Sequence, residues 1–231
     1  MVWIAALALA AMDTQLMPRN KVSCDLASFI GGGSSSEGNL DSLDGLNLAC
    51  NVVLYDRGTW TIGPRVEFAE QRWSVFKTTH DATNLISYQA RTVGLGLHAD
   101  YSLSPSWRLG YTFNFAMGQG SQEQNISTAR SSQSLRYSAM AQRDLRHEFT
   151  VSRQVNSRMA LLAGLQFNSA QQSWDASAGT LAQENVAAGN KLTLTSGTSS
   201  ELEQSLKQSS SYKAMSIKLG VQMNFDASPI P

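Results

Sequence analysis

Three histidines, with the polar residues near them, are the side chains in this sequence that could act as a catalytic base. His98 stands two positions before Asp100, so in a strand both side chains lie on one face and the carboxylate can orient the imidazole. His147 precedes Ser152, and the two are a base and a nucleophile of the kind that an acyl hydrolase uses. Both pairs also have a structural interpretation, with His98 and Asp100 in a polar network and His147 at a membrane interface. His80 lies in a polar segment and is most simply a solvated loop residue.

The cysteines and the glycine-rich segment offer no site for a cofactor or metal. Cys24 and Cys50 are too few and too far apart for a metal site of ordinary spacing. Their midpoint falls in the polar segment GGGSSSEGNLDSLDG, so a hairpin that turns there would place them opposite each other. A disulfide and two free thiols, buried or lipid-facing, both stay open. The run at 31–36 is no phosphate loop, because no Gly-Lys-Ser/Thr follows it. We therefore expect no cofactor and no metal.

The composition excludes some classes of partner. The chain has 231 residues, with Lys+Arg and Asp+Glu both at 18, so its formal net charge is zero and nothing indicates nucleic-acid binding. Charged residues make up 16%, below the ~25% typical of soluble domains. The longest apolar run, MVWIAALALAAM at 1–12, has about the length of the apolar core of a secretory signal. We interpret it as a signal peptide remnant, with an ordinary N-terminal helix as the alternative.

The strongest pattern in the chain is alternation with period two, which indicates strands. In WRLGYTFNFAMGQG at 107–120, every odd position up to Met117 is large and apolar, and the even positions between them are small or polar. The alternation recurs in LNLACNVVLYD, TWTIGPRVEFAE, TVGLGLHADYSL, SLRYSAMAQRDLRHEFTVS, RMALLAGLQFN and YKAMSIKLGVQMNF. Tight connections alternate with long polar ones, as in a meander of hairpins. Closing such a sheet with both ends on the tight-turn side needs an even number of strands, so we expect one more over 20–30.

Two architectures fit this alternation: a soluble sandwich or barrel with its apolar side chains inside, and a membrane barrel with them outside. Several segments alternate over about 10 residues, the ~9–11 that cross a bilayer at a tilt. Glycines occupy the polar face, where a narrow lumen needs small residues. Aromatic residues gather at the strand ends, as at membrane interfaces: Tyr55, Trp60, Tyr101, Trp107 and Trp174. Trp73 is the exception unless the strand shifts phase beyond Glu70. These features favour the membrane barrel.

The last strand, SIKLGVQMNF, is apolar at alternate positions and ends on Phe225, and it resembles the C-terminal recognition strand of bacterial outer-membrane barrels. With its tight turns, polar loops and apparent export signal, the chain over 20–225 resembles the small eight-stranded outer-membrane family typified by the transmembrane domain of outer-membrane protein A. We therefore expect an all-β chain, an eight-stranded antiparallel up-and-down transmembrane β-barrel in the bacterial outer membrane. The expected ranges are 1–12 for the signal remnant, 13–225 for the barrel with long extracellular loops, and 226–231 for a C-terminal tail.

An eight-stranded barrel is just wide enough for side chains to fill it, and the polar face here carries charges of both signs. An unpaired charge in that lumen would be very costly, so we expect an interlocking network of ion pairs and hydrogen bonds. Its expected members are Arg65, Glu67, His98, Asp100, Arg108, Arg136, Asp144, Arg146, Glu148 and Lys218. Such a network closes a lumen more readily than it lines a pore.

The sequence favours a non-enzymatic role in membrane integrity, adhesion, or binding of another envelope protein through the extracellular loops. Outer-membrane lipid is the other expected partner. A lipid-modifying enzyme that uses His98 or His147 is one alternative, and a narrow channel or a carrier for small solutes is another. The segment at 171–211, which contains KLTLT, is expected to extend the barrel as a hairpin outside the membrane.

Overall fold

The computed structural model of the chain describes residues 21–79, 82–128, 132–156, 158–174, 179–185, 190–195 and 209–226. The predicted signal remnant at 1–12 and the loop residue His80 lie outside these ranges. So does the predicted tail at 226–231, except for Asp226, which is the last residue of a strand. Within them, no helix is long and apolar enough to cross a membrane.

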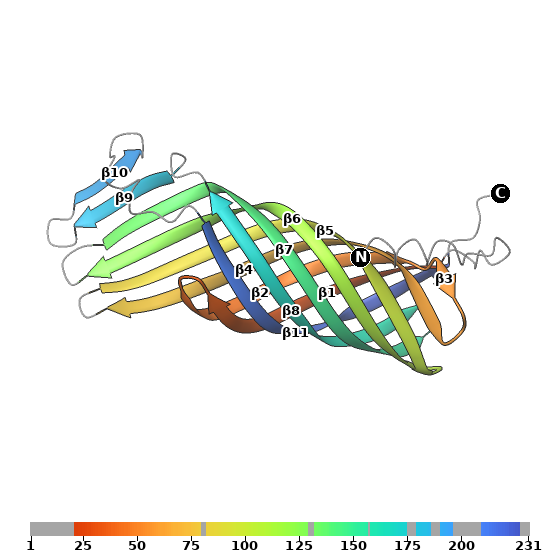
Figure 1. Cartoon of the computed structure of the whole chain (residues 1–231). Helices are drawn as coiled ribbons and strands as arrows, with labels where there is room; N and C mark the ends of the chain where they lie inside the picture. Colours follow the sequence, from red (N-terminus) through yellow and green to blue (C-terminus); the bar gives the residue numbers. More distant parts are fainter. Residues whose placement is uncertain are drawn as a thin grey trace.

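Eight long strands of the described chain close into an antiparallel barrel, and the predicted fold class is confirmed (Figure 1). These strands are β1 (Lys21–Ser35), β2 (Gly38–Val52), β4 (Trp60–Thr79), β5 (Ala82–Ser104), β6 (Trp107–Thr128), β7 (Ser132–Asn156), β8 (Met159–Trp174) and β11 (Ser209–Asp226). Each pairs with the strands before and after it around the ring, and β1 pairs with β11 to complete the closure. A short strand, β3 (Tyr55–Asp56), pairs with β4 at the tight turn that follows β2. The eighth strand expected over 20–30 is β1.

Three of the four segments predicted as long polar loops are largely strand. A turn at Ser36 and Glu37 joins β1 to β2, with Gly38 directly after it at a φ of 151° that favours glycine. Only 80–81 separate β4 from β5, and only 129–131 separate β6 from β7. The prediction was wrong there because Gly, Ser, Thr, Gln and Asn dominate these segments and the outer face meets water. The few apolar residues in them, such as Leu40 and Leu43, face the interior and are too sparse to show alternation. The backbone hydrogen bonds between neighbouring strands do not depend on alternating side chains, so the strands continue through these segments.

The fourth segment contains the expected hairpin, which is confirmed. In it β9 (Gly179–Asn185) pairs antiparallel with β10 (Asn190–Thr195), the strand that holds KLTLT. β9 also pairs with the part of β7 that runs on beyond the end of β8. The hairpin therefore widens the sheet outside the closed ring, at the end of the barrel opposite the tight turns (Figure 1).

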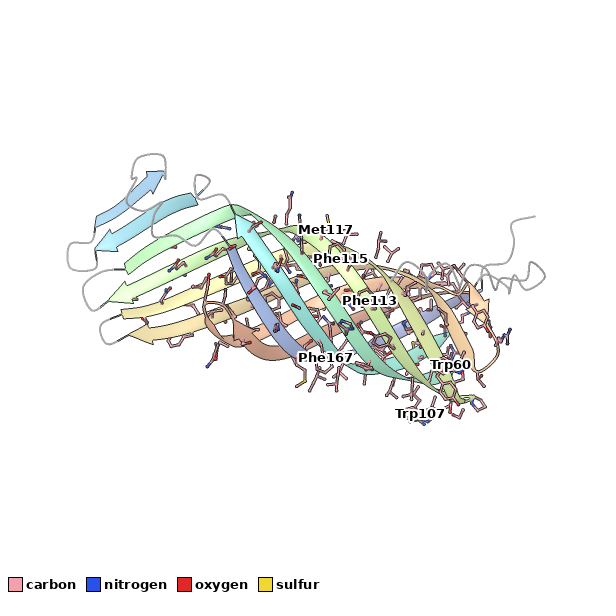
Figure 2. The ribbon with its side chains drawn as sticks, in the orientation of Figure 1. Trp60, Trp107, Phe113, Phe115, Met117 and Phe167 are labelled. Carbon is pink, nitrogen blue, oxygen red and sulfur yellow. A yellow bond between two sulfur atoms is a disulfide. The ribbon has the colours of Figure 1, made fainter. Side chains whose placement is uncertain are left out.

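The side chains of the barrel point the opposite way from those of a soluble β-protein. Along β6 the odd residues from Trp107 to Met117 are 38–53% exposed, whereas Thr112 and Asn114 are 1% and 0% exposed. Figure 2 shows this row of apolar side chains on the outside of the barrel. The other barrel strands repeat the pattern, with leucine, valine, isoleucine and phenylalanine outward and charged or amide side chains inward. The predicted orientation is confirmed.

Cys24 and Cys50 lie opposite each other on β1 and β2 and form a disulfide. The turn at Ser36 and Glu37 lies at the midpoint between them, where the hairpin had to turn for the two thiols to meet. The bridge joins residues 26 positions apart, so it removes conformational freedom from the unfolded chain.

Replacing both Cys24 and Cys50 with alanine is expected to lower the free energy of unfolding by about 2–4 kcal/mol, because the unfolded chain regains that freedom. Urea unfolding in detergent micelles measures the change. Reductant should weaken the wild-type protein by a similar amount and leave the double variant unaffected. A wild-type unfolding midpoint that does not respond to reductant would contradict the prediction.

Candidate functional site

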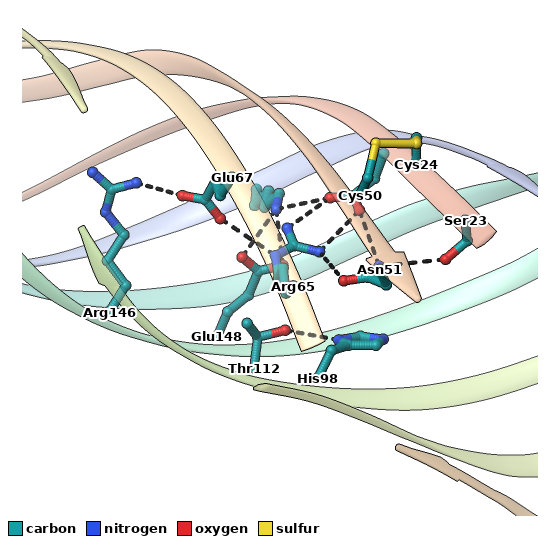
Figure 3. A network of polar contacts seen from close by, with 12 residues as sticks. Ser23, Cys24, Cys50, Asn51, Arg65, Glu67, His98, Thr112, Arg146 and Glu148 are labelled. Atoms are coloured by element: carbon teal, nitrogen blue, oxygen red, sulfur yellow. Dashed lines mark hydrogen bonds and ion pairs between the residues drawn. A yellow bond between two sulfur atoms is a disulfide. The ribbon is translucent and has the colours of Figure 1, made fainter. Parts of the chain in front are cut away.

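Arg65 is the centre of an ion-pair cluster that fills the middle of the barrel (Figure 3). Its guanidinium, on β4, donates two parallel hydrogen bonds to Asp25 of β1, from Nη1 to Oδ1 and from Nη2 to Oδ2, each 2.9 Å long. Nη1 also donates to Oδ1 of Asn51 on β2 at 3.0 Å, and Nε donates to Oε2 of Glu67 at 3.4 Å. Two-point pairing of this kind fixes the orientation of the side chains as well as their charge.

Glu67 connects this centre to a second arginine, Arg146 of β7, which donates to both Glu67 and Asp144. Arg146 also donates from Nη2 to Oγ1 of Thr92 at 2.7 Å. Asp144 accepts further hydrogen bonds from two glutamine amides at 2.6 and 2.7 Å. The network thus extends from β1 through β4 to β7, across the whole width of the lumen.

Lys218 of β11 completes the cluster from the remaining side of the barrel. Its Nζ lies 2.9 Å from both carboxylate oxygens of Glu148 and 3.4 Å from Oδ2 of Asp25. The cluster so defined contains seven buried groups, three basic and four acidic: Arg65, Arg146 and Lys218 with Asp25, Glu67, Asp144 and Glu148. Moving ions out of water costs several kcal/mol each unless they are paired, so each of these groups depends on its partners.

Two other predicted members, His98 and Asp100, adjoin this cluster, because they line one small cavity with Asp25, Arg65 and Glu148. His98 and Asp100 form a pair of their own towards the tight-turn end, with Nε2 3.0 Å from Oδ2, and Nδ1 of His98 lies 2.8 Å from Oγ1 of Thr112. Arg108 is half-buried near the start of β6.

Arg136 does not lie in the lumen, and that prediction is wrong, because its side chain is exposed. A β-bulge between Gly120 and Gln122 shifts the register between β6 and β7, so Arg136 pairs with Glu123, a position in the outward phase of β6. A shift of one residue exchanges the two faces of a strand. The even numbers that point inward over most of β7 therefore point outward beyond the bulge.

His147 and Ser152 face opposite sides of the barrel wall, so they do not form the nucleophile and base of an acyl hydrolase. His147 lies on the outward face, where its Nδ1 is 2.9 Å from the hydroxyl of Tyr111, whereas Ser152 is buried inside. Within the described ranges, no three histidine, cysteine, aspartate or glutamate side chains are placed to hold a metal ion.

An apolar plug fills the lumen between the ion-pair cluster and the long-strand end of the barrel. Its main members are Phe29, Leu40, Leu43, Trp73, Val75, Ile86, Tyr88, Met140 and Tyr212. The rings of Trp73 and Tyr88 stack with centroids 4.9 Å apart, and Tyr212 packs against Trp73 at 5.0 Å. The hydroxyl of Tyr212 donates to Oε1 of Gln71 at 3.1 Å, which connects the plug to the polar residues below it. β4 keeps its alternation past Glu70, and this is why Trp73 faces inward.

The turn between β1 and β2 is attached to this plug. The hydroxyl of Tyr88 donates to Oε2 of Glu37 at 2.5 Å. Burial, together with the negative charge of Glu37, raises the pKa of Tyr88 well above its ordinary value, so the phenol keeps its proton and remains a donor. The hairpin of β1 and β2 is thereby held over the inner face of β5.

Sequence reasoning missed two parts of this interior, Asp25 with Asn51 and the aromatic plug. The signal for Asp25 was present: if Cys24 and Cys50 face each other on the outside, their neighbours Asp25 and Asn51 must face inward. The plug is not visible in the sequence because its members come from six strands, and some of them lie in segments that the composition predicts as loops.

Charged side chains return to the outer surface above the apolar band. Glu70 accepts hydrogen bonds from Arg72 at 3.3 Å and from Arg91 at 3.2 Å, and the bond from Arg72 lowers the pKa of Glu70. Arg143 of β7 and Lys213 of β11 are exposed at the same end of the barrel. These outward residues form a charged outer rim.

Aromatic side chains form the opposite rim, beside the tight turns. The rings of Trp60 and Tyr101 lie 4.8 Å apart, and the guanidinium of Arg153 lies 5.6 Å from the ring of Trp107 (Figure 2). Tyr55 has a similar contact with a neighbouring arginine at 5.6 Å. Between the two rims the outer surface is apolar and the interior contains ionisable groups. This is the reverse of a soluble β-protein, and it is the arrangement expected of a barrel surrounded by lipid. The fold is that of a transmembrane β-barrel. The side chain of Trp174, predicted for the other interface, lies outside the described part.

Beyond the outer rim, the outer face of the barrel is polar and contains a shallow groove. It crosses five strands, and its polar lining consists of Ser42, Asp44, Arg72, Ser74, Ser87, Gln89, Ser121, Glu123 and Arg136. The hydroxyls of Ser42 and Ser74 are hydrogen-bonded at 3.0 Å, and Gln89 donates to Glu70 at 2.9 Å. The groove offers hydroxyl groups, amides and charges of both signs on a rigid sheet.

No family model matches this chain, and no curated protein matches it significantly. Solved structures do show a likeness of architecture. The outer membrane protease OmpT from Escherichia coli is 10% identical, with 90% of this chain and 97% of that chain covered and a TM-score of 0.49. The attachment invasion locus protein Ail of Yersinia pestis is 11% identical, with 90% and 100% covered and a TM-score of 0.42. Neisserial surface protein A is 13% identical, with 90% and 98% covered and a TM-score of 0.43. No site residue is transferred at such identities.

Proposed function

We propose that this outer-membrane barrel is a closed, non-enzymatic scaffold that binds a polar partner through the sheet that it builds outside the membrane. The observation that carries the proposal is the length of the strands. β4, β5, β6 and β7 continue well past the charged outer rim, and the hairpin of β9 and β10 widens the sheet that they form. A barrel that served only to span the bilayer would need about 9–11 residues per strand.

The groove on the outer face of this extension is the candidate binding surface. Its side chains come from neighbouring strands that hydrogen-bond to one another, so their positions are fixed before a ligand arrives. Such preorganisation lowers the entropic cost of binding. Hydroxyl groups and amides with charges of both signs suit a polyhydroxylated or mixed-charge partner, such as a polysaccharide or the polar surface of another envelope protein.

The filled lumen favours the scaffold function and argues against a channel. The ion-pair cluster and the apolar plug succeed each other along the barrel axis, and the largest side chains in them are fully buried. Each obstructs an aqueous path by itself.

In planar bilayers the refolded protein is therefore expected to produce no unitary ion conductance. The experiment needs a porin as a positive control for insertion, and heat-modifiable migration on a gel as evidence of folding. Stable conductance steps from the folded protein would overturn the closed scaffold.

Filling the groove is expected to abolish partner binding and leave the barrel folded. Ser74→Trp and Ser121→Trp place bulk in the groove. Ser211→Trp is the matched control, because it places the same bulk on the exposed outer face of β11, which β1 and β8 separate from the strands that line the groove. Binding of protein in lipid nanodiscs to immobilised polysaccharides and to other envelope proteins is the measurement. We expect at least about a tenfold loss for the groove variants only. Equal binding by all three variants, or no binding by the wild type, would overturn the proposal.

A further inference from the structure

The outward face of β7 carries a histidine in the middle of the apolar band. His147 stands between Arg143 at the outer rim and Arg153 at the rim beside the tight turns. At ~3.3 Å per residue and a strand tilt of ~40°, His147 lies about 10 Å below the level of Arg143. Ionisable residues at such depth are rare, and they usually mark a functional contact.

Only one of the two ring nitrogens of His147 has a hydrogen-bond partner in the described part of the chain. Its Nδ1 lies 2.9 Å from the hydroxyl of Tyr111, and within the described part of the chain no group is hydrogen-bonded to Nε2. A polar atom that faces hydrocarbon without a partner costs several kcal/mol. Acyl chains offer no acceptor, so a group from outside this chain is needed at Nε2.

The same flank of the barrel carries exposed aromatic side chains from the middle of the band: Tyr111, Phe113, Phe115, Phe149 and Phe167. Figure 2 labels Phe113, Phe115 and Phe167 on the outside of the barrel. Tyr111 packs on Phe149 with ring centroids 5.0 Å apart, and Phe113 meets His147 edge-on at 5.2 Å. The flank formed by β1, β2 and β11 is aliphatic in the corresponding part of the band: Leu26, Ile30, Leu46, Leu48, Ile217 and Leu219. Lipid gives no reason for this asymmetry, whereas the cores of protein interfaces are enriched in aromatic residues.

We propose that the outward face of β6, β7 and β8 is the contact between two copies of this chain within the membrane. The pair of Tyr111 and His147 is self-complementary. With Tyr111 donating to Nδ1, the Nε2 atom carries the proton, and the oxygen of Tyr111 keeps a lone pair. A two-fold axis beside the pair sets Nε2–H of each copy against the Tyr111 oxygen of the other, so both copies are satisfied by one symmetric contact.

The aromatic flank provides enough surface for this contact. Its five rings are each 38–53% exposed, which leaves on the order of 400 Å² per copy at ~150–250 Å² for each whole side chain. With the aliphatic neighbours, two copies approach the ~1,000 Å² expected of a specific interface. In lipid the association is driven by packing and by hydrogen bonds, and this flank supplies both.

The test uses the full chain in lipid vesicles at low protein density. Phe113→Cys places a thiol beside the proposed axis, because Phe113 pairs with His147 across β6 and β7, and Leu48→Cys is the control on the opposite flank. Oxidation is expected to cross-link the Phe113→Cys protein to itself and to leave the Leu48→Cys protein monomeric. Adding His147→Phe, which keeps the ring and removes the nitrogens, should weaken the cross-linking equilibrium by about tenfold, because two hydrogen bonds are lost per dimer.

Each other outcome overturns the proposal. Equal cross-linking of the two cysteine variants would show that the copies meet by random collision. An unchanged yield of cross-linked dimer with His147→Phe would show that His147 does not contribute to the contact. Failure of Phe113→Cys to cross-link to itself, together with cross-linking to a different protein in native membranes, would assign the face to another partner. Heat-modifiable migration of every variant establishes that the barrel is folded.

Discussion

Replacing Arg65 with methionine is expected to lower the free energy of unfolding by about 3–5 kcal/mol. The substitution keeps the bulk of the side chain but removes the donors that Asp25, Asn51 and Glu67 share. Two carboxylates then lie in a water-poor lumen with fewer cationic partners, and the cost of leaving a buried charge unpaired exceeds the worth of the original pair. Equilibrium urea unfolding of the barrel in lipid vesicles, followed by heat-modifiable migration and tryptophan fluorescence, measures the loss.

Arg72→Met is the matched control, because Arg72 lies on the same strand and its side chain is 63% exposed where it contacts Glu70. Its loss should cost less than about 1 kcal/mol. The double variant Arg65→Met with Asp25→Leu removes both members of the closest pair, so it should recover part of the stability lost in the single variant. If Arg65→Met and Arg72→Met had the same effect, the cluster would contribute nothing specific to stability.

The membrane-spanning part of the fold could be predicted from the sequence because there the two faces meet different surroundings. Lipid outside and a crowded polar lumen inside impose a period of two, and β6 shows it without a break from Trp107 to Met117. The same logic fails beyond the outer rim, where the outward row of apolar residues ends. At the far ends of β4 to β7, Ser, Thr, Gln and Asn dominate the composition, so no alternation indicates that the strands continue.

The polar interior could be predicted as a set of residues but not as a set of pairs. Arg65, Glu67, Asp144, Arg146, Glu148 and Lys218 follow from strand phase alone. Which of them meet depends on the stagger of strands around the ring, which no local pattern records. The face of Arg136 is likewise set by one bulge in the β6–β7 ladder, which the residue types around it do not indicate.

The lumen contains an apolar plug with aromatic residues as well as the ion-pair cluster, and the two lie at different levels of the barrel. Trp73, Tyr88 and Tyr212 lie above the outer rim on the inside, at the level where the outer face is already polar. At that level the barrel stands in water and must be stabilised as a soluble β-protein is, by an apolar core of its own. The polarity of the two faces therefore inverts along β4 and β5, whose residues Trp73, Val75, Ile86 and Tyr88 face inward beyond the outer rim.

This inversion gives the second large effect: Trp73→Ala is expected to lower the free energy of unfolding by about 3–5 kcal/mol, through lost burial and the cavity left between Tyr88 and Tyr212. Phe76→Ala, three positions along the same strand but 51% exposed on the outer face, should cost less than about 1 kcal/mol. Urea unfolding compares the two, and proteolysis of the folded protein should open the extension of the Trp73→Ala variant first while the spanning segments stay protected. Because the ion-pair cluster lies below the plug and is untouched, the variant should still migrate as a folded barrel. Equal losses for Trp73→Ala and Phe76→Ala would mean that the apolar plug does not stabilise the strands outside the membrane.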